Sequence, residues 1–161
     1  MAQGEERRRG IKLKLSLDTS VLISHFRTDE FSGETLRFFR WARKEGLSLL
    51  ISEVVYAELY AGIFLSANPD DEEYRVQKFL ATNNISTHLT GSQEVVKRAG
   101  QMFAKYLILR KGARKRILPD FLIASHAESY SDVLVTWNPA DFKDYLNIPV
   151  LTPTEVIKEL S

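Results

Sequence analysis

Acidic residues follow several apolar segments of this 161-residue sequence. Asp18 comes directly after Leu13–Leu17, and Asp141 comes a few residues after Val133–Val135. Asp120 falls in the first turn of a helix predicted over residues 119–129. In open α/β sheets, functional sites lie outside the carboxyl ends of the strands, so these side chains are expected to converge there.

Glu58 is the least expected of the acidic residues. Its neighbours three and four positions away are Val54, Val55, Ala61 and Gly62, so the carboxylate projects from the apolar face of its helix. A buried carboxylate is costly unless it is paired or bound to a metal ion. This position therefore indicates a functional carboxylate.

Each of the other acids also has a purely structural interpretation. Asp18 could cap a helix, Asp120 could favour a helix N-terminus, and Asp141 could be a turn residue. Four converging carboxylates would repel one another, and a divalent cation would remove that conflict. No histidine lies at ligand spacing with these acids, so the ligand types favour Mg²⁺ or Mn²⁺ over zinc. Such an ion can activate water for attack on a phosphodiester.

Alternating strand and helix patterns must position these residues. Strands are predicted over 11–17, 47–51, 85–89, 133–135 and 148–151. Helices are predicted from Val21, over 33–45, from Ser52, from about Asp71, from Gly91-Ser92 to about Lys111, over 119–129 and from Thr154 to Leu160. This order predicts a three-layer α/β/α sandwich with a mostly parallel sheet, formed by one domain over 11–161 after a flexible tail at 1–10.

Two strands carry a further signal. In the first strand Lys12, Lys14 and Ser16 alternate with apolar residues, so one face is expected to be open or covered by polar groups. Pro149 makes the last strand an edge candidate, since proline cannot donate a hydrogen bond within a sheet.

Composition limits the function further. The 22 Lys and Arg nearly balance the 21 Asp and Glu, for a net charge of +1, so nucleic-acid binding would need a local basic patch. The absence of cysteine excludes disulfides, thiolate catalysis and cysteine-ligated metals. No apolar run approaches the roughly 20 residues of a membrane span, and Lys12 and Lys14 interrupt any signal-peptide core. We expect a cytoplasmic protein.

A basic stretch precedes the Asp120 helix. It contains Arg110, Lys111, Arg114, Lys115 and Arg116. These cations could hold RNA phosphates near the acidic residues, or they could form a solvated helix end.

Four segments together resemble a known family. They are Asp18-Thr19-Ser20 after the first strand, Val54–Leu59 around Glu58, Pro119–Ala124 around Asp120, and Thr136-Trp137-Asn138-Pro139-Ala140-Asp141-Phe142. Their order and spacing resemble PIN-domain proteins of the VapC-like toxin-ribonuclease type, over about residues 11–158. Trp137 departs from this pattern, since an arginine or another polar residue is common there. It could stack on a base or belong to the core.

The resemblance implies a Mg²⁺- or Mn²⁺-dependent endoribonuclease that cuts single-stranded or loop RNA. Its acidic metal pocket would comprise Asp18, Glu58, Asp120 and Asp141. Groups orienting those acids or a water would be Thr19 or Ser20, Thr136 and Asn138.

The resemblance also implies partners. VapC-like toxins form homodimers and bind an antitoxin peptide in a groove, and here aromatic-rich helices around Leu36, Phe38, Phe39 and Trp41, and around Tyr56, Tyr60 and Phe64, could line one. Two alternatives remain open. One is an RNA-processing PIN nuclease without an antitoxin, and the other is a catalytically inactive PIN module that binds RNA or protein.

Overall fold

The computed structural model describes residues 12–110 and 116–161. Its centre is a five-stranded sheet with the strand order β3-β2-β1-β4-β5. The strands are β1 (Lys14–Leu17), β2 (Ser48–Ser52), β3 (Ile85–His88), β4 (Val133–Val135) and β5 (Val150–Leu151). Every neighbouring pair is parallel, so the predicted sheet type is confirmed and the carboxyl ends of all five strands point the same way.

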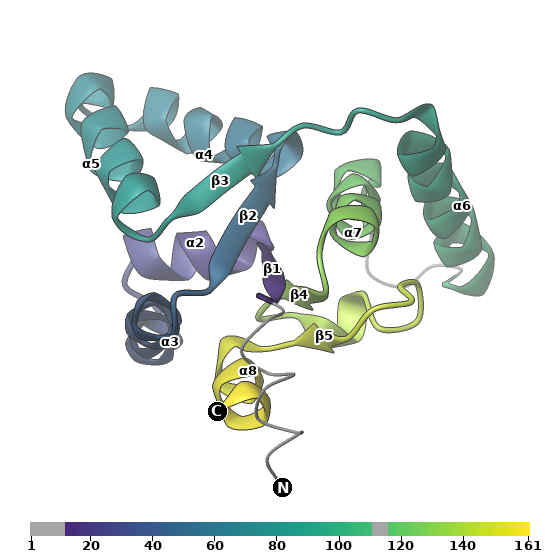
Figure 1. Ribbon diagram of the computed structural model, residues 1–161. Coiled ribbons are helices and arrows are strands. Elements are labelled where there is room, and N and C mark those ends of the chain that lie inside the picture. Colours follow the sequence, from purple (N-terminus) through teal and green to yellow (C-terminus); the bar gives the residue numbers. More distant parts are fainter. Residues whose placement is uncertain (1–11, 111–115) are drawn as a thin grey trace, which may run out of the picture.

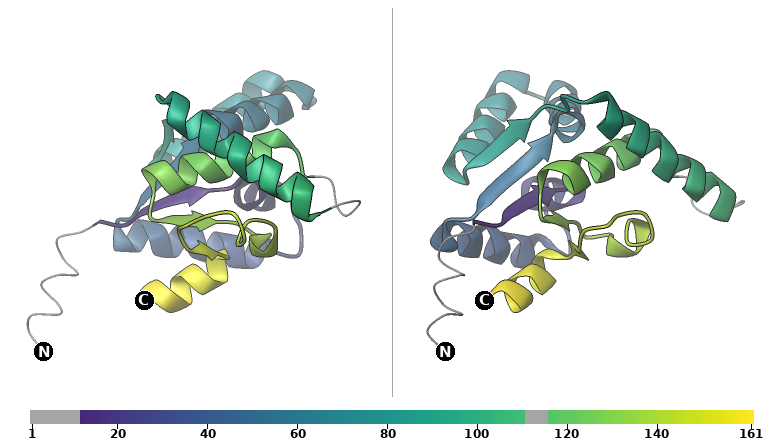
Figure 2. Two further views of the ribbon diagram at one scale, coloured as in Figure 1. Left: turned by 90° about the vertical axis from the view of Figure 1, so that its right-hand side faces the viewer. Right: turned by 45° about the vertical axis from the view of Figure 1, so that its right-hand side comes forward.

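Helices cover both faces of this sheet (Figure 1). They are α2 (Thr19–Phe26), α3 (Ser32–Glu45), α4 (Glu53–Leu65), α5 (Pro69–Thr82), α6 (Gln93–Leu109), α7 (Leu118–Tyr130) and α8 (Pro153–Leu160), with a short 3₁₀ turn, η1 (Pro139–Asp141). The group α2–α5 lies on one side and α6 with α7 on the other, as the rotated views of Figure 2 also show. This is the predicted three-layer α/β/α arrangement. Among the helices described, none is long and apolar enough to cross a membrane.

Local sequence signals account for most element boundaries. Gly46 ends α3 with a left-handed φ of 64°, which glycine adopts without a Cβ clash. The Ser52 hydroxyl accepts a hydrogen bond from the Val55 N–H at 3.3 Å and so caps α4. Pro119 occupies the first turn of α7, where its missing N–H costs nothing.

Other boundaries differ from the sequence predictions by a few residues. The first strand begins at Lys14, not at residue 11, and the following helix begins at Thr19, not at Val21. The last strand begins at Val150, after Pro149, and lies at the edge of the sheet as its proline predicts. The predicted tail at 1–10 falls outside the described residues.

The core contains large apolar side chains from both helix layers and from the sheet. Phe38, Phe39, Phe121 and Phe142 are among the fully buried ones. The polar face predicted for β1 divides into two parts: Lys14 is exposed, whereas Ser16 is buried between its neighbours on β2 and β4. Lys14 lines a polar hollow of about 520 Å³ with Ser48, Ser86, His88, Tyr130, Asp132 and their neighbours. One face of the β1–β3 part of the sheet is therefore open to polar surroundings beside the end of α7.

Candidate functional site

Asp18 is the most buried acid of the predicted site. It occupies the N-cap position of α2 immediately after β1 without a side-chain capping hydrogen bond, and its side chain and backbone together are only 7% exposed. Its Oδ2 accepts hydrogen bonds from Ser20 Oγ at 2.9 Å and from Thr136 Oγ1 at 2.8 Å. Burial raises the pKa of Asp18, the hydroxyl hydrogen bonds oppose that rise, and the charge of Asp120 adds to it.

Thr136 joins the end of β4 to the start of α2. Besides donating to Asp18, its Oγ1 accepts a hydrogen bond from the Asn138 N–H at 3.1 Å and lies 3.3 Å from Ser20 Oγ. Ser20 Oγ in turn accepts a hydrogen bond from the Trp137 N–H at 3.1 Å. Ser20 and Thr136 thus hold the Asp18 carboxylate by their side chains, whereas Asn138 contributes through its backbone.

Glu58 lies on α4 and is exposed, so the inference that it is buried on an apolar face is wrong. Of the apolar residues beside it, Val55 is buried and Val54 half-buried, but Ala61 and Gly62 are at the surface, so Glu58 lies outside the buried face of α4. Partial desolvation still raises the pKa of Glu58, and the charges of Asp18 and Asp120 add to the rise.

Asp120 lies in the first turn of α7, and its Oδ2 accepts a hydrogen bond from the Ile117 N–H at 3.2 Å. Its charge acts on both Asp18 and Glu58, so the three carboxylates share one electrostatic site. Within residues 12–110 and 116–161, however, no three acidic or histidine side chains lie close enough together to hold one ion. Side-chain rotation would be needed to bring the carboxylates onto a common ligand.

Two features of this site fit a hard divalent cation. The donors are all carboxylates, which suit Mg²⁺ or Mn²⁺. The Thr19 hydroxyl is buried next to Asp18 and, among the residues described, accepts and donates no hydrogen bond. A water bound to such a cation would supply the missing partner.

Asp141 joins the site indirectly. It lies on η1 and forms an ion pair with Arg116, whose other guanidinium nitrogen lies 3.6 Å from Asp120 Oδ2. Of the other residues of the basic stretch, Arg110 pairs with Asp144 at 3.6 Å. Lys111, Arg114 and Lys115 lie outside the described residues. The sequence reasoning missed the Arg116 ion pairs, although its spacing of four from Asp120 could have suggested one of them.

Trp137 has a structural role in this protein. Its Nε1 donates a hydrogen bond to Thr35 Oγ1 at 3.0 Å, and its ring stacks on Phe31 at a centroid distance of 4.4 Å. These contacts connect the end of β4 to α3 and its preceding loop. The sequence left open whether Trp137 stacks on a base or packs in the core, and its contacts are those of a packed residue.

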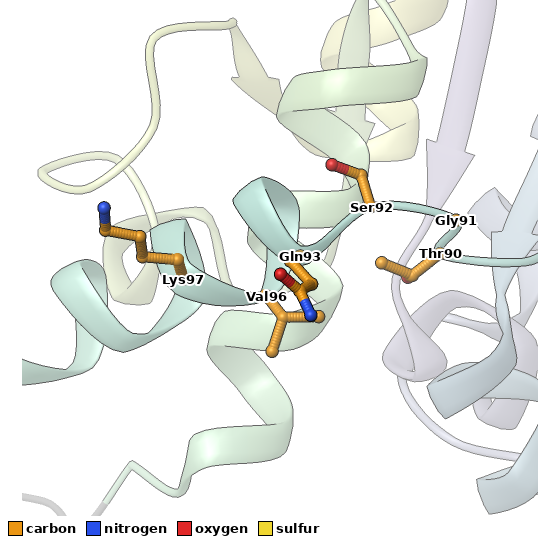
Figure 3. A pocket seen from close by; sticks show the side chains of 6 residues that line it. All are labelled: Thr90, Gly91, Ser92, Gln93, Val96 and Lys97. Atoms are coloured by element: carbon orange, nitrogen blue, oxygen red, sulfur yellow. The ribbon is translucent and has the colours of Figure 1, made fainter.

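A second hollow lies at the start of α6 and is shown in Figure 3. It is lined by Thr90, Gly91, Ser92, Gln93, Val96 and Lys97. None of these residues is acidic, so this hollow does not contribute ligands to the acidic site.

Residues 15–148 match the family model described as the PIN domain. No curated protein has a matching sequence. Among solved structures, one similar chain comes from a DNA-bound VapBC complex of Salmonella typhimurium, with 25% identity, a TM-score of 0.67, and coverage of 88% of this chain and 98% of that one. Another comes from VapBC2 of Rickettsia felis bound to a promoter DNA fragment, with 21% identity, a TM-score of 0.67, and coverage of 86% and 97%. Mycobacterium tuberculosis VapC20, described as a sarcin–ricin loop cleaving toxin, matches with 15% identity, a TM-score of 0.52, and coverage of 74% and 86%.

Proposed function

Because this chain belongs to the PIN-domain family, we propose that it is a metal-dependent endoribonuclease and the toxin of a toxin–antitoxin pair. The observation that carries this proposal is the shared electrostatic site of Asp18, Glu58 and Asp120 beyond the carboxyl end of β1. Mutually repelling carboxylates reduce stability unless a cation compensates them. Such a cluster of carboxylates is therefore expected where the protein uses it to bind a cation.

Asp18, Glu58 and Asp120 would hold Mg²⁺ or Mn²⁺ through their carboxylate oxygens. The ion, when bound, would lower the pKa of a water and stabilise negative charge on a phosphodiester. Ser20 and Thr136 fix the orientation of the Asp18 carboxylate through Oδ2. The Thr19 hydroxyl, buried beside that carboxylate, would hold a water in the site. Cleavage would leave a 5′-phosphate and a 3′-hydroxyl.

The substrate we propose is single-stranded or loop RNA. Support comes from the fold shared with VapC20, which is described as cleaving the sarcin–ricin loop. The exposure of Glu58 leaves the site open to a polymer that must approach from solvent. The basic stretch precedes Asp120 in the sequence, and its cations, exposed Arg110 among them, would bind phosphates of the RNA backbone.

A groove among the helices of the α2–α5 group supports an antitoxin partner. It has a volume of about 250 Å³ and lies between α2, α3 and α5. Its walls combine the apolar and aromatic side chains of Leu36, Phe39 and Phe79 with six polar or basic ones, those of His25, Arg43, Arg75, Lys78, Thr82 and Asn83. A peptide with apolar anchors and acidic residues would fit this lining. Several VapBC complexes share this fold, and their antitoxins are the model for such a partner.

A homodimer is also proposed. Phe64 and Leu65 at the end of α4 are 68% and 87% exposed, which gives this helix an apolar surface suited to a second copy. Sedimentation of the purified chain would test this: a single species at the monomer mass at micromolar concentration would contradict it.

The nuclease proposal is tested by cleavage of labelled RNAs, including a sarcin–ricin loop hairpin, with Mg²⁺ or Mn²⁺ against EDTA. Wild type is compared with Asp18→Asn and with Asp70→Asn, a matched control because Asp70 is an exposed acid on α5. We expect metal-dependent cleavage by wild type and Asp70→Asn only. Equal activity in Asp18→Asn would refute the assignment. Binding of RNA without cleavage in either metal would favour the inactive RNA-binding module.

A further inference from the structure

Arg116 places a positive charge of the chain itself within the acidic site. One guanidinium nitrogen pairs with Asp141 Oδ2, and the other lies 3.6 Å from Asp120 Oδ2. Asp120 and Asp141 come from different elements, α7 and η1, and the guanidinium is the cation that they share.

The surroundings hold Arg116 in this position. The guanidinium carbon lies 5.3 Å from the centre of the Phe142 ring, and the Arg116 N–H donates a 2.7 Å hydrogen bond to the Tyr106 hydroxyl. The Arg116 and Asp141 side chains are each 20% exposed and that of Asp120 is 22% exposed. By contrast, Arg110 and Asp144 form a surface pair whose side chains are 46% and 63% exposed. Partial burial makes the Arg116 pairs stronger than a surface pair, since less water screens them.

The acidic site thus has two sides. On one side, Asp18 and Glu58 have no basic side chain as an ion-pair partner among the described residues. On the other side, Asp120 and Asp141 are already compensated by Arg116. A divalent ion between Asp120 and Asp141 would compete with the guanidinium, because both cations would be drawn to the same two carboxylates and would repel each other.

We propose that Arg116 takes the place of a second metal ion, so that the site binds a single divalent cation at Asp18, Glu58 and Asp120 and none between Asp120 and Asp141. This inference rests on the proposed function, because it presumes that the acidic site binds Mg²⁺ or Mn²⁺. It assigns Arg116 to positioning Asp120 and Asp141 and to setting the number of metal ions.

The test counts bound Mn²⁺ per chain by the electron paramagnetic resonance signal of free Mn²⁺, without any substrate. We expect one Mn²⁺ for wild type and two for Arg116→Gln, the second binding more weakly. Arg116→Lys, which keeps a cation, should bind one. Arg110→Gln, the matched control that breaks the surface pair with Asp144, should also bind one.

A second comparison applies if Arg116→Gln does not fold. In wild type and Asp141→Asn we expect one Mn²⁺ of similar affinity, since Asp141 is paired with Arg116 rather than with metal. Two Mn²⁺ in wild type, falling to one in Asp141→Asn, would overturn the inference. So would one Mn²⁺ in a folded Arg116→Gln. Either result would leave the proposed function intact, whereas no Mn²⁺ binding by wild type would overturn the metal-dependent function and this inference with it.

Discussion

The burial of Asp18 leads to a prediction about stability. Asp18 is only 7% exposed and its pKa is raised chiefly by burial, so the charged form of its carboxylate is disfavoured in the folded state. Asp18→Asn removes the charge and keeps an oxygen that can accept the hydrogen bonds from Ser20 and Thr136. In the absence of metal, we expect this variant to be more stable than wild type.

The expected gain in the free energy of unfolding is the difference between two opposing effects. An uncompensated buried ion costs several kcal/mol after relaxation of its surroundings. Changing the acceptor from charged to neutral weakens each of its two hydroxyl hydrogen bonds by about 1 kcal/mol. The net gain is of order 1 kcal/mol, which corresponds to a rise in Tm of about 2–4 °C for a chain of this size.

The raised pKa also predicts how the stability difference between Asp18→Asn and wild type changes with pH. The folded-state pKa of Asp18 lies above its unfolded value, so the carboxylate costs stability at pH values above the folded pKa. That cost declines as the pH falls through the folded pKa, and the advantage of Asp18→Asn over wild type should decline with it. Thermal unfolding in EDTA from pH 8 to pH 4 would measure this, with Asp70→Asn as the exposed control. An Asp18→Asn variant less stable than wild type at pH 7 would refute the reasoning.

Three further predictions concern residues around the site and the core. Thr136→Val removes the hydroxyl that orients Asp18, so we expect a 10- to 100-fold loss of Mn²⁺ affinity with the fold retained; unchanged affinity in a titration would contradict it. His126 is fully buried and burial lowers its pKa, so the unfolded state protonates first and stability should fall as the pH drops below about 6.5. Urea midpoints of wild type and His126→Gln between pH 8 and 5 should then show a weaker pH dependence in the variant, and equal slopes would exclude this residue as the cause. Trp137→Phe keeps the stacking on Phe31 but loses the hydrogen bond to Thr35, so we expect a loss of about 1 kcal/mol in urea unfolding with Mn²⁺ binding unchanged. A loss of Mn²⁺ binding would instead place Trp137 in the site.

Local patterns in the sequence were sufficient for the order of elements and for most of their boundaries. Gly46 and Ser52 act where their own chemistry predicts, because a helix end needs a left-handed residue or a side-chain cap whatever lies around it. Asp18 was identifiable because it follows a strand, and parallel topology brings the carboxyl ends of strands to one edge.

The exposure of Glu58 was not predictable from its neighbours in the sequence. Apolar residues at helical spacing indicate a buried face only where another element covers them, and Ala61 and Gly62 remain at the surface. Whether a helix face is covered depends on packing between elements, which no local pattern contains.

The sequence by itself therefore determined the α/β order, the parallel sheet and the acidic residues at its carboxyl edge. The tertiary structure decided how those acids are paired. Arg116 and Asp141 are 25 positions apart in the chain, and only the fold, which brings the residues before α7 next to η1, places their charges together. Ion pairs between distant residues depend on where the backbone carries the charges, and that is a property of the packed fold.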